Sequence, residues 1–269
     1  MHPKFTIYTP SYTDKSAGIW ILHFLCDRLN HLGYPAELVI MPSADCVNPE
    51  FQTPIAYDRS SIVIYPEVVA GNPLGAKKVV RYLLNLEGAI NGQKIAWNPT
   101  DFPLSYSKIY RNDCDILFYP ITNLDIFYRD ARNKEGFCFY RGKSHYLGPI
   151  PQINFSEEIT RTWPEKKQDL AEIFRNRLLL FSCDKASSTC LDAALCGCVP
   201  VILGGCNDIG ELGKFWANDL PEIMDALKVI DELHERINAI RGSFDTNLAM
   251  IVSKIAAHFE MHETSGSAE

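Results

Sequence analysis

The segment that decides the fold runs from Phe181 to Gly205 and reads FSCDKASSTCLDAALCGCVPVILGG. Two short apolar runs, Leu178–Cys183 and Val199–Leu203, are typical of strands that are buried in a parallel sheet. Between them, Ser187–Cys196 predicts a short helix, because serine favours the start of a helix and glycine its end. A strand, a helix and a second strand in this order predict a βαβ unit.

The rest of the chain repeats this alternation on both sides of a polar stretch, Tyr128–Gly136. Before that stretch, short β-branched or aromatic runs predict strands at Phe5–Tyr8, Ala36–Ile40, Ile62–Tyr65, Lys94–Trp97 and Ile116–Tyr119. After it, two strands and a helix are predicted at Phe137–Tyr140, Glu158–Arg161 and Pro164–Asn176. A last helix is expected over Asn247–Phe259, where the apolar residues share one face.

We therefore expect an α/β protein with two Rossmann-like lobes, each built on a parallel sheet, and a C-terminal helix that closes the chain. The polar stretch is expected to mark the boundary between the lobes. This divides the chain into lobes 1–132 and 133–245 and a C-terminal helix and tail, 246–269. Loops at the carboxyl ends of the strands are the expected ligand sites.

Two helices are predicted in the first lobe. One begins at Ala17 and stops at Gly33, and the other begins at Pro73 and carries Val79, Val80, Leu83 and Leu84 on one side. The second helix also carries three basic residues, Lys77, Lys78 and Arg81, which are expected to face solvent. The alternative is that this basic trio contacts an acceptor phosphate or an anionic membrane surface.

The composition excludes several classes of protein. The chain has 26 Lys and Arg against 33 Asp and Glu, and its net charge of −7 has the wrong sign for binding nucleic acid through phosphates. It has neither the ~18–20 apolar residues that cross a bilayer nor an export signal at its start, so we expect a cytoplasmic protein. The nine cysteines are odd in number and several of them lie in apolar runs, which predicts core packing rather than disulfides.

Familiar catalytic motifs are missing from the sequence. It contains no Gly-x-x-x-x-Gly-Lys-Ser/Thr phosphate loop, no Gly-x-Gly-x-x-Gly fingerprint and no His-Glu-x-x-His metal motif. Asp113-Cys-Asp115 precedes a predicted strand, so we assign these carboxylates to a turn and predict no metal site. The absence of these motifs, and of a Ser-His-Asp pattern, disfavours hydrolases, P-loop enzymes and ordinary dehydrogenases.

The loop between the two strands of the opening segment carries the most informative polar residues. Asp184 ends the first strand, and either Ser187 or Ser188 can cap the helix. Free backbone N–H groups and the positive end of the helix dipole there favour an anion. Asp192 lies farther along the helix, where a carboxylate can reach sugar hydroxyls. The segment is thus suited to a sugar nucleotide, although a capping Asp and a solvated Asp would show the same pattern.

This segment resembles the two-lobed GT-B glycosyltransferases, especially retaining bacterial enzymes with a Glu-x7-Glu motif before a small-residue Gly-Pro-Val run. Here the matching residues are Asp184-x7-Asp192, followed by Ala193–Val201. The resemblance implies that Asp184 meets the donor sugar and Asp192 the nucleotide ribose. Both acids are Asp in this chain, where the family has Glu.

A second run, Phe137–Lys143, is similar to the strand and Gly-Arg turn that open the donor lobe in the same family. The resemblance places Lys143 on the pyrophosphate-binding Arg, where a cation stabilises the departing diphosphate. Arg141 either assists it or is a surface charge. Trp163 falls beside the nucleobase in this comparison and either stacks on the base or is a buried structural residue.

In the first lobe, Thr13–Gly18 resembles the glycine-rich loop that approaches the donor phosphates. Ser16 is a candidate N-cap there, and Gly18 allows close approach. Glu67 and Asn72 follow a predicted strand and are the candidate acceptor contacts, with ordinary turn chemistry as the alternative.

Together these features predict a glycosyltransferase of polysaccharide biosynthesis that moves a hexose from a nucleoside diphosphate to a glycan or lipid-linked acceptor. The resemblance implies a retaining reaction that uses no metal and no cofactor besides the donor. Two alternatives stay open: a non-catalytic module that binds sugar nucleotides or carbohydrates, and a GT-B-like epimerase that acts on a sugar nucleotide.

Overall fold

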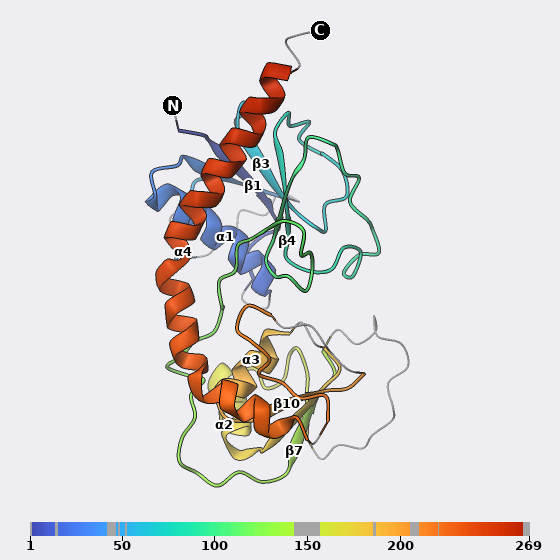
Figure 1. The fold of residues 1–269 in the computed structure, drawn as a ribbon, viewed down its shortest axis with the longest axis vertical. Coiled ribbons are helices and arrows are strands. Elements are labelled where there is room, and N and C mark those ends of the chain that lie inside the picture. Colours follow the sequence, from blue (N-terminus) through green and yellow to red (C-terminus); the bar gives the residue numbers. More distant parts are fainter. Residues whose placement is uncertain are drawn as a thin grey trace. The chain divides into compact units, whose positions relative to one another are not determined.

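Two parallel sheets, helices that connect some of their strands and a long C-terminal helix form the regular structure of the described residues (Figure 1). The computed structural model describes residues 2–13, 16–41, 47, 49–51, 53–142, 157–184, 187–204, 210–219 and 221–265. The predicted α/β class, with two Rossmann-like lobes and a C-terminal helix, is confirmed. None of the helices in these ranges has the length and hydropathy that crossing a bilayer requires.

The first unit comprises residues 1–119 and 241–269. Its sheet has the strand order β2-β1-β3-β4-β5-β6, and every neighbouring pair is parallel. The strands are β1 (Phe5–Thr9), β2 (Ala36–Ile40), β3 (Ile62–Pro66), β4 (Val79–Leu83), β5 (Phe102–Ser105) and β6 (Asp115–Ile116). Helix α1 (Ala17–His31) connects β1 to β2 and buries Leu22, Leu25 and Leu29.

The sequence explains both ends of α1. Ser16 has an extended backbone and its side chain accepts a hydrogen bond from the Ile19 backbone N–H at 3.4 Å, which satisfies one free amide of the first turn. At the other end, Gly33 adopts a φ of +82°, a conformation that costs glycine little. The predicted helix from Ala17 to the glycine stop is therefore confirmed.

The helix predicted from Pro73 is wrong, because its apolar half is the strand β4. All five residues of β4 are buried, as expected for a central strand of a parallel sheet, and a continuous apolar run fits either a strand or a buried helix. The strand predicted at Lys94–Trp97 is also absent, since the chain enters the sheet at β5 instead. The predicted strand Ile116–Tyr119 is shorter and begins one residue earlier, as β6.

Arg81, one of the basic trio, points into the core rather than into solvent. Its Nε lies 2.9 Å from Oδ2 of Asp101, and the two side chains are only 2% and 3% exposed. The guanidinium also donates to the backbone oxygens of Val69 (3.1 Å) and Gly71 (2.8 Å). The expectation of a solvent-facing trio is thus wrong for Arg81, whose partners come from two distant loops, and right for Lys77, which is exposed.

The second unit comprises residues 120–240. Its parallel sheet has the order β10-β9-β7-β8, formed by β7 (Phe137–Tyr140), β8 (Glu158–Ile159), β9 (Leu179–Ser182) and β10 (Val199–Ile202). Helix α2 (Lys167–Asn176) leads from β8 to β9, and α3 (Ser188–Leu195) from β9 to β10. The strand, helix and strand expected in the opening segment are confirmed, with Val199 paired to Leu179.

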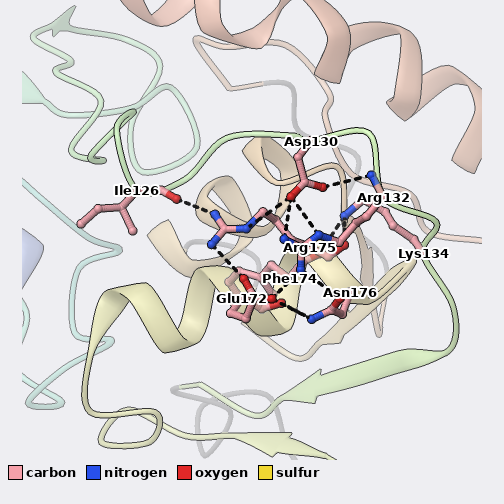
Figure 2. A network of polar contacts seen from close by, with 8 residues as sticks. All are labelled: Ile126, Asp130, Arg132, Lys134, Glu172, Phe174, Arg175 and Asn176. Carbon is pink, nitrogen blue, oxygen red and sulfur yellow. Dashed lines mark hydrogen bonds and ion pairs between the residues drawn. The ribbon is translucent and has the colours of Figure 1, made fainter.

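Residues 120–136 form an irregular segment, here called the strap, which leads into β7. Figure 2 shows how it is attached to the C-terminal end of α2. Nζ of Lys134 donates to the backbone oxygens of Phe174 (3.0 Å) and Arg175 (2.7 Å), and Arg175 donates to the Ile126 oxygen at 2.9 Å. A cation at these carbonyls satisfies acceptors that a helix end leaves free. The predicted lobe boundary, between residues 132 and 133, lies inside the strap.

Helix α4 (Ile223–Ser265) contributes to both units, residues 223–240 to the second and 241–265 to the first. The predicted helix Asn247–Phe259 lies within it. In the first unit, its buried residues include Phe244, Leu248, Ile251, Ile255 and Phe259. Polar contacts supplement this packing, since Asn247 donates to the Ile116 backbone oxygen (3.3 Å) and Asp245 pairs with Arg28.

The Arg81–Asp101 pair gives the first stability prediction. Replacing Asp101 with Ala should lower the free energy of unfolding by about 3–5 kcal/mol, because the Arg81 charge would remain buried without its carboxylate. Urea denaturation measures the change. The matched control is Asp225→Ala, which breaks an exposed pair with Lys228 and should leave the free energy of unfolding nearly unchanged, because water screens such pairs. Similar losses in the two variants would contradict a structural role for the buried pair.

Candidate functional site

The strand order of the second unit marks the carboxyl ends of two of its strands as a candidate ligand site. The chain passes from β7 to β8 on one side and then returns to β9 on the other side of β7. The carboxyl ends of β7 and β9 are therefore a topological switch point, where the two outgoing loops diverge. Open parallel sheets bind their ligands at such points. Gly142 follows β7 here, and Asp184 follows β9.

Gly142 and Asp184 are in close contact at the switch point. A Cβ atom on Gly142 would lie 2.4 Å from the Asp184 Cβ and 2.7 Å from its Oδ2. Gly142 also has a φ of +57°, which is unfavourable for any residue with a side chain. Both the space and the backbone conformation thus require glycine, and this glycine lets the two loops approach closely.

Ser187 fixes the start of α3 at the same edge. Its side chain accepts a hydrogen bond from the Thr189 backbone N–H at 3.2 Å, so Ser187 is the N-cap and the exposed Ser188 is the first helical residue. The Ser187 hydroxyl also donates to the hydroxyl of Tyr140, the last residue of β7, at 3.4 Å. The backbone N–H of Cys183 bonds to the Tyr140 oxygen at 3.1 Å. Tyr140 therefore links the end of β7 to both ends of the β9–α3 loop.

The electrostatics of this edge combine a partial positive charge with a carboxylate. The helix dipole and the backbone N–H of Ser188, which has no hydrogen-bond partner among the described residues, favour an anion. Asp184 is partly exposed beside them, and its backbone N–H is held by the Ser182 hydroxyl at 3.1 Å. Such a site can hold a phosphate on the amides and hydroxyl groups on the carboxylate.

Asp192 has a different environment, one turn into α3. Its Oδ1 accepts a hydrogen bond from the Thr122 hydroxyl in the strap at 2.7 Å. Burial raises the pKa of Asp192 to about 7, although the hydrogen bond from Thr122 and the charge of Lys167 favour the ionised form. One carboxylate oxygen is thus already engaged by the protein. The solvated Asp considered from the sequence does not describe this residue.

The other predicted donor residues differ in how the structure places them. Lys143 lies outside the described residues. The Arg141 side chain is half exposed and forms an ion pair at 3.0 Å with Glu158 of β8. This carboxylate compensates the charge of Arg141. Trp163 follows β8 and is 48% exposed, which leaves its ring accessible and excludes a buried structural role.

The predicted residues of the first unit mostly make local contacts. Ser16 caps α1, and a Cβ on Gly18 would meet Leu84 only at an ordinary distance of 3.6 Å. Glu67 is buried, and its carboxylate accepts a hydrogen bond from the Leu84 backbone N–H at 2.9 Å. Leu84 is therefore a neighbour of both Gly18 and Glu67.

Asn72 closes a turn. Its amide donates to the Ala76 backbone oxygen (2.8 Å), and its Oδ1 accepts from the Ala76 N–H (2.9 Å) and the Tyr65 hydroxyl (2.9 Å). The turn chemistry considered from the sequence therefore describes Asn72 well. Its side chain is committed to holding the loop after β3.

Three residues at or near the switch point were not among the predicted site residues: Gly142, Tyr140 and Thr122. Gly142 lies within the run Arg141–Lys143, so its position between two basic residues after a strand was a usable signal. Tyr140 and Thr122 act through partners 47 and 70 residues away, and no local pattern reveals such pairs. Over the described ranges, no three His, Cys, Asp or Glu side chains are grouped so that they could hold a metal ion.

The Gly142 contact gives a test of the switch-point geometry. Gly142→Ala should lower the free energy of unfolding by about 2–4 kcal/mol, from a strained backbone and from overlap with Asp184. Gly75→Ala is the matched control, because Gly75 has a similar φ of +61° but nothing within 4 Å of its Cβ position. It should cost about 1 kcal/mol. Equal losses in chemical denaturation would show that Asp184 does not restrict residue 142.

The pKa of Asp192 gives a pH-dependent stability prediction. Because its folded-state pKa is raised to about 7, the neutral carboxyl contributes stability that is complete below pH ~4 and is lost as the pH rises to about 7. Asp192→Asn cannot ionise, so it should exceed the wild type in stability at pH 8 by roughly 1–3 kcal/mol and lack this decline. Urea denaturation from pH 4 to 8 measures both. A constant difference between the two proteins would contradict the raised pKa.

No model of a known protein family matches this chain. A search of curated proteins finds no match either. The case for a function therefore rests on the residues at the switch point of the second unit and on their chemistry.

Proposed function

We propose that the second unit binds a nucleoside diphosphate sugar at the carboxyl ends of β7 and β9, and that the protein is a glycosyltransferase. The observation that carries this proposal is the contact of Gly142 with Asp184 beside the N-terminus of α3. Three features then lie at one switch point: the N-terminus of α3, whose dipole favours anions, the partly exposed carboxylate of Asp184, and the close approach of the Gly142 backbone. The resemblance of the same segment to retaining GT-B enzymes supports the same choice of ligand.

In the proposed reaction, the bond between the anomeric carbon and the diphosphate oxygen breaks. The diphosphate leaves with the electron pair, a hydroxyl group of the acceptor forms the new glycosidic bond, and the proton of that hydroxyl group passes to the departing diphosphate. The Ser188 N–H and the α3 dipole would stabilise the charge that builds up on the diphosphate. Lys143 would add a cation, as the resemblance implies, and Asp184 would hold hydroxyls of the hexose.

Asp192 fits the ribose role only through its second carboxylate oxygen, because Thr122 occupies the first. A hydroxyl group of the ribose that donates to this second oxygen would favour the ionised carboxylate, and donor binding would then lower the pKa of Asp192. Trp163, exposed after β8, offers an accessible ring on which a nucleobase can stack. We propose a glycan or a lipid-linked glycan as the acceptor.

One observation favours a non-catalytic binding module as the second candidate. Glu67 and Asn72, the candidate acceptor contacts, both use their polar atoms to hold loops of the first unit. A protein that had kept its donor site and lost its acceptor site would show this combination. Turnover of a bound donor, followed by nuclear magnetic resonance of the anomeric proton with and without an acceptor glycan, separates the two candidates.

Isothermal titration calorimetry tests the donor site directly. The wild-type protein should bind at least one nucleoside diphosphate among UDP, GDP, ADP, CDP and dTDP, and should bind the corresponding sugar nucleotide more tightly. Asp184→Ala should weaken the sugar nucleotide about tenfold, or ~1.4 kcal/mol, and the free diphosphate much less, because Asp184 would contact the sugar.

The matched control is Asp169→Ala, which removes an exposed carboxylate from α2 in the same unit. It should leave both affinities unchanged. If a folded sample binds none of the five nucleotides, the proposed function is wrong. If the two aspartate variants bind alike, Asp184 is not part of the donor site.

A further inference from the structure

Tyr140, the last residue of β7, contacts both loops at the switch point of the second unit. Its backbone oxygen accepts a hydrogen bond from the Cys183 N–H at 3.1 Å, and its hydroxyl group accepts one from the Ser187 hydroxyl at 3.4 Å. A Cβ atom on Gly142 would lie 2.9 Å from Cε1 of the Tyr140 ring. The ring edge next to the hydroxyl group therefore lies close to the turn after β7, and the hydroxyl group itself borders the start of α3.

Ser187 uses its hydroxyl group both as donor and as acceptor, whereas Tyr140 uses its hydroxyl group only as acceptor. Ser187 accepts from the Thr189 N–H and donates its proton to the Tyr140 oxygen. A hydroxyl group also has a proton of its own to donate, and that of Tyr140 has no acceptor among the described residues, although only 6% of Tyr140 is exposed. A buried donor without an acceptor is costly, so this proton requires a partner that the described residues do not supply.

The partner that suits this position best is an anion. The Tyr140 oxygen lies 3.4 Å from the Ser187 oxygen, which in turn lies 3.2 Å from the Thr189 nitrogen in the first turn of α3. The hydroxyl group is therefore close to the positive end of the helix dipole. A phosphate group has several acceptor oxygens and can accept from Tyr140 and from the Ser188 N–H together. A cation or an apolar group there would leave the Tyr140 proton unpaired.

We propose that Tyr140 is a further ligand-binding residue of this site, and that its hydroxyl group donates to the diphosphate of the ligand beside the Ser188 N–H. The inference rests on the proposed function, because it assumes a ligand that places a diphosphate at the start of α3. Tyr140 would give the site a neutral donor that is held by a buried strand end. In the proposed reaction, the same donor would stabilise the charge on the departing diphosphate.

Isothermal titration calorimetry of the full chain tests this role with inorganic pyrophosphate, UDP, GDP, ADP, CDP and dTDP as probes. Tyr140→Phe removes the hydroxyl group and keeps the ring. It should weaken the binding of pyrophosphate, and of every nucleoside diphosphate that the wild type binds, by at least ~10-fold. The matched control is Tyr128→Phe, which changes an exposed ring in the same unit and should bind all probes as the wild type does. Chemical denaturation checks that both variants are folded.

A double-mutant cycle separates a direct contact of Tyr140 with the ligand from an effect through Ser187. Ser187→Ala removes the cap and leaves the Tyr140 hydroxyl group in place. If Tyr140 donates to the ligand, Tyr140→Phe should still weaken pyrophosphate binding at least ~10-fold in the Ser187→Ala protein. If the loss disappears there, Tyr140 acts only by positioning Ser187 and the inference is wrong.

The remaining outcomes distinguish this inference from the proposed function. If the wild type binds a nucleoside diphosphate and Tyr140→Phe binds it equally well, water receives the Tyr140 proton. The inference is then overturned, and the proposed donor site stands without this residue. A wild type that binds a nucleoside diphosphate but not pyrophosphate also overturns the inference alone. A folded wild type that binds none of the probes overturns both.

Discussion

The second unit depends on the close approach of the loops that leave β7 and β9. Only glycine allows this approach, because a Cβ atom at position 142 would overlap the side chain of Asp184. The contact fixes where the β9–α3 loop begins, and the Tyr140–Ser187 hydrogen bond fixes where it ends and α3 starts. The helix dipole, the Ser188 amide and the partly exposed Asp184 carboxylate are therefore positioned by backbone geometry, which is what binding a phosphate through main-chain groups requires.

Asp184, which precedes α3, and Asp192, which lies within it, have opposite environments. The difference suits two different tasks. Asp184 is partly exposed at the edge of the sheet, where ligand hydroxyls can reach it. Asp192 is held by Thr122 in surroundings that disfavour its charge. A residue kept at a cost in stability is a reasonable candidate for a functional role, since selection for stability alone would replace it by Asn.

Much of the architecture could be predicted because the strands and helices carry signals in their own residues, such as apolar runs and helix-capping residues. The segment from Phe181 to Gly205 shows this best. The helix from Pro73 was mispredicted because the spacing of Val79, Val80 and Leu83 fits a helix face and a buried strand alike. Asp101 and the backbone oxygens of Val69 and Gly71, which lie far from Arg81 in sequence, explain how Arg81 can be buried there. In the candidate site, Asp184 and Ser187 were predictable from their places before a helix. The Gly142 contact and the Thr122 bond join segments far apart in sequence, so no single stretch reveals them.

Because α4 contributes to both units, it sets the order in which they can be completed during synthesis. The second unit has all its residues once Ile240 has left the ribosome, because it is continuous from residue 120. The first unit is discontinuous: until α4 is made it lacks Phe244, which packs against Phe24 of α1, and the buried residues Leu248 and Ile255. Its N-terminal part must therefore remain without its final helix while the later unit is translated and folds.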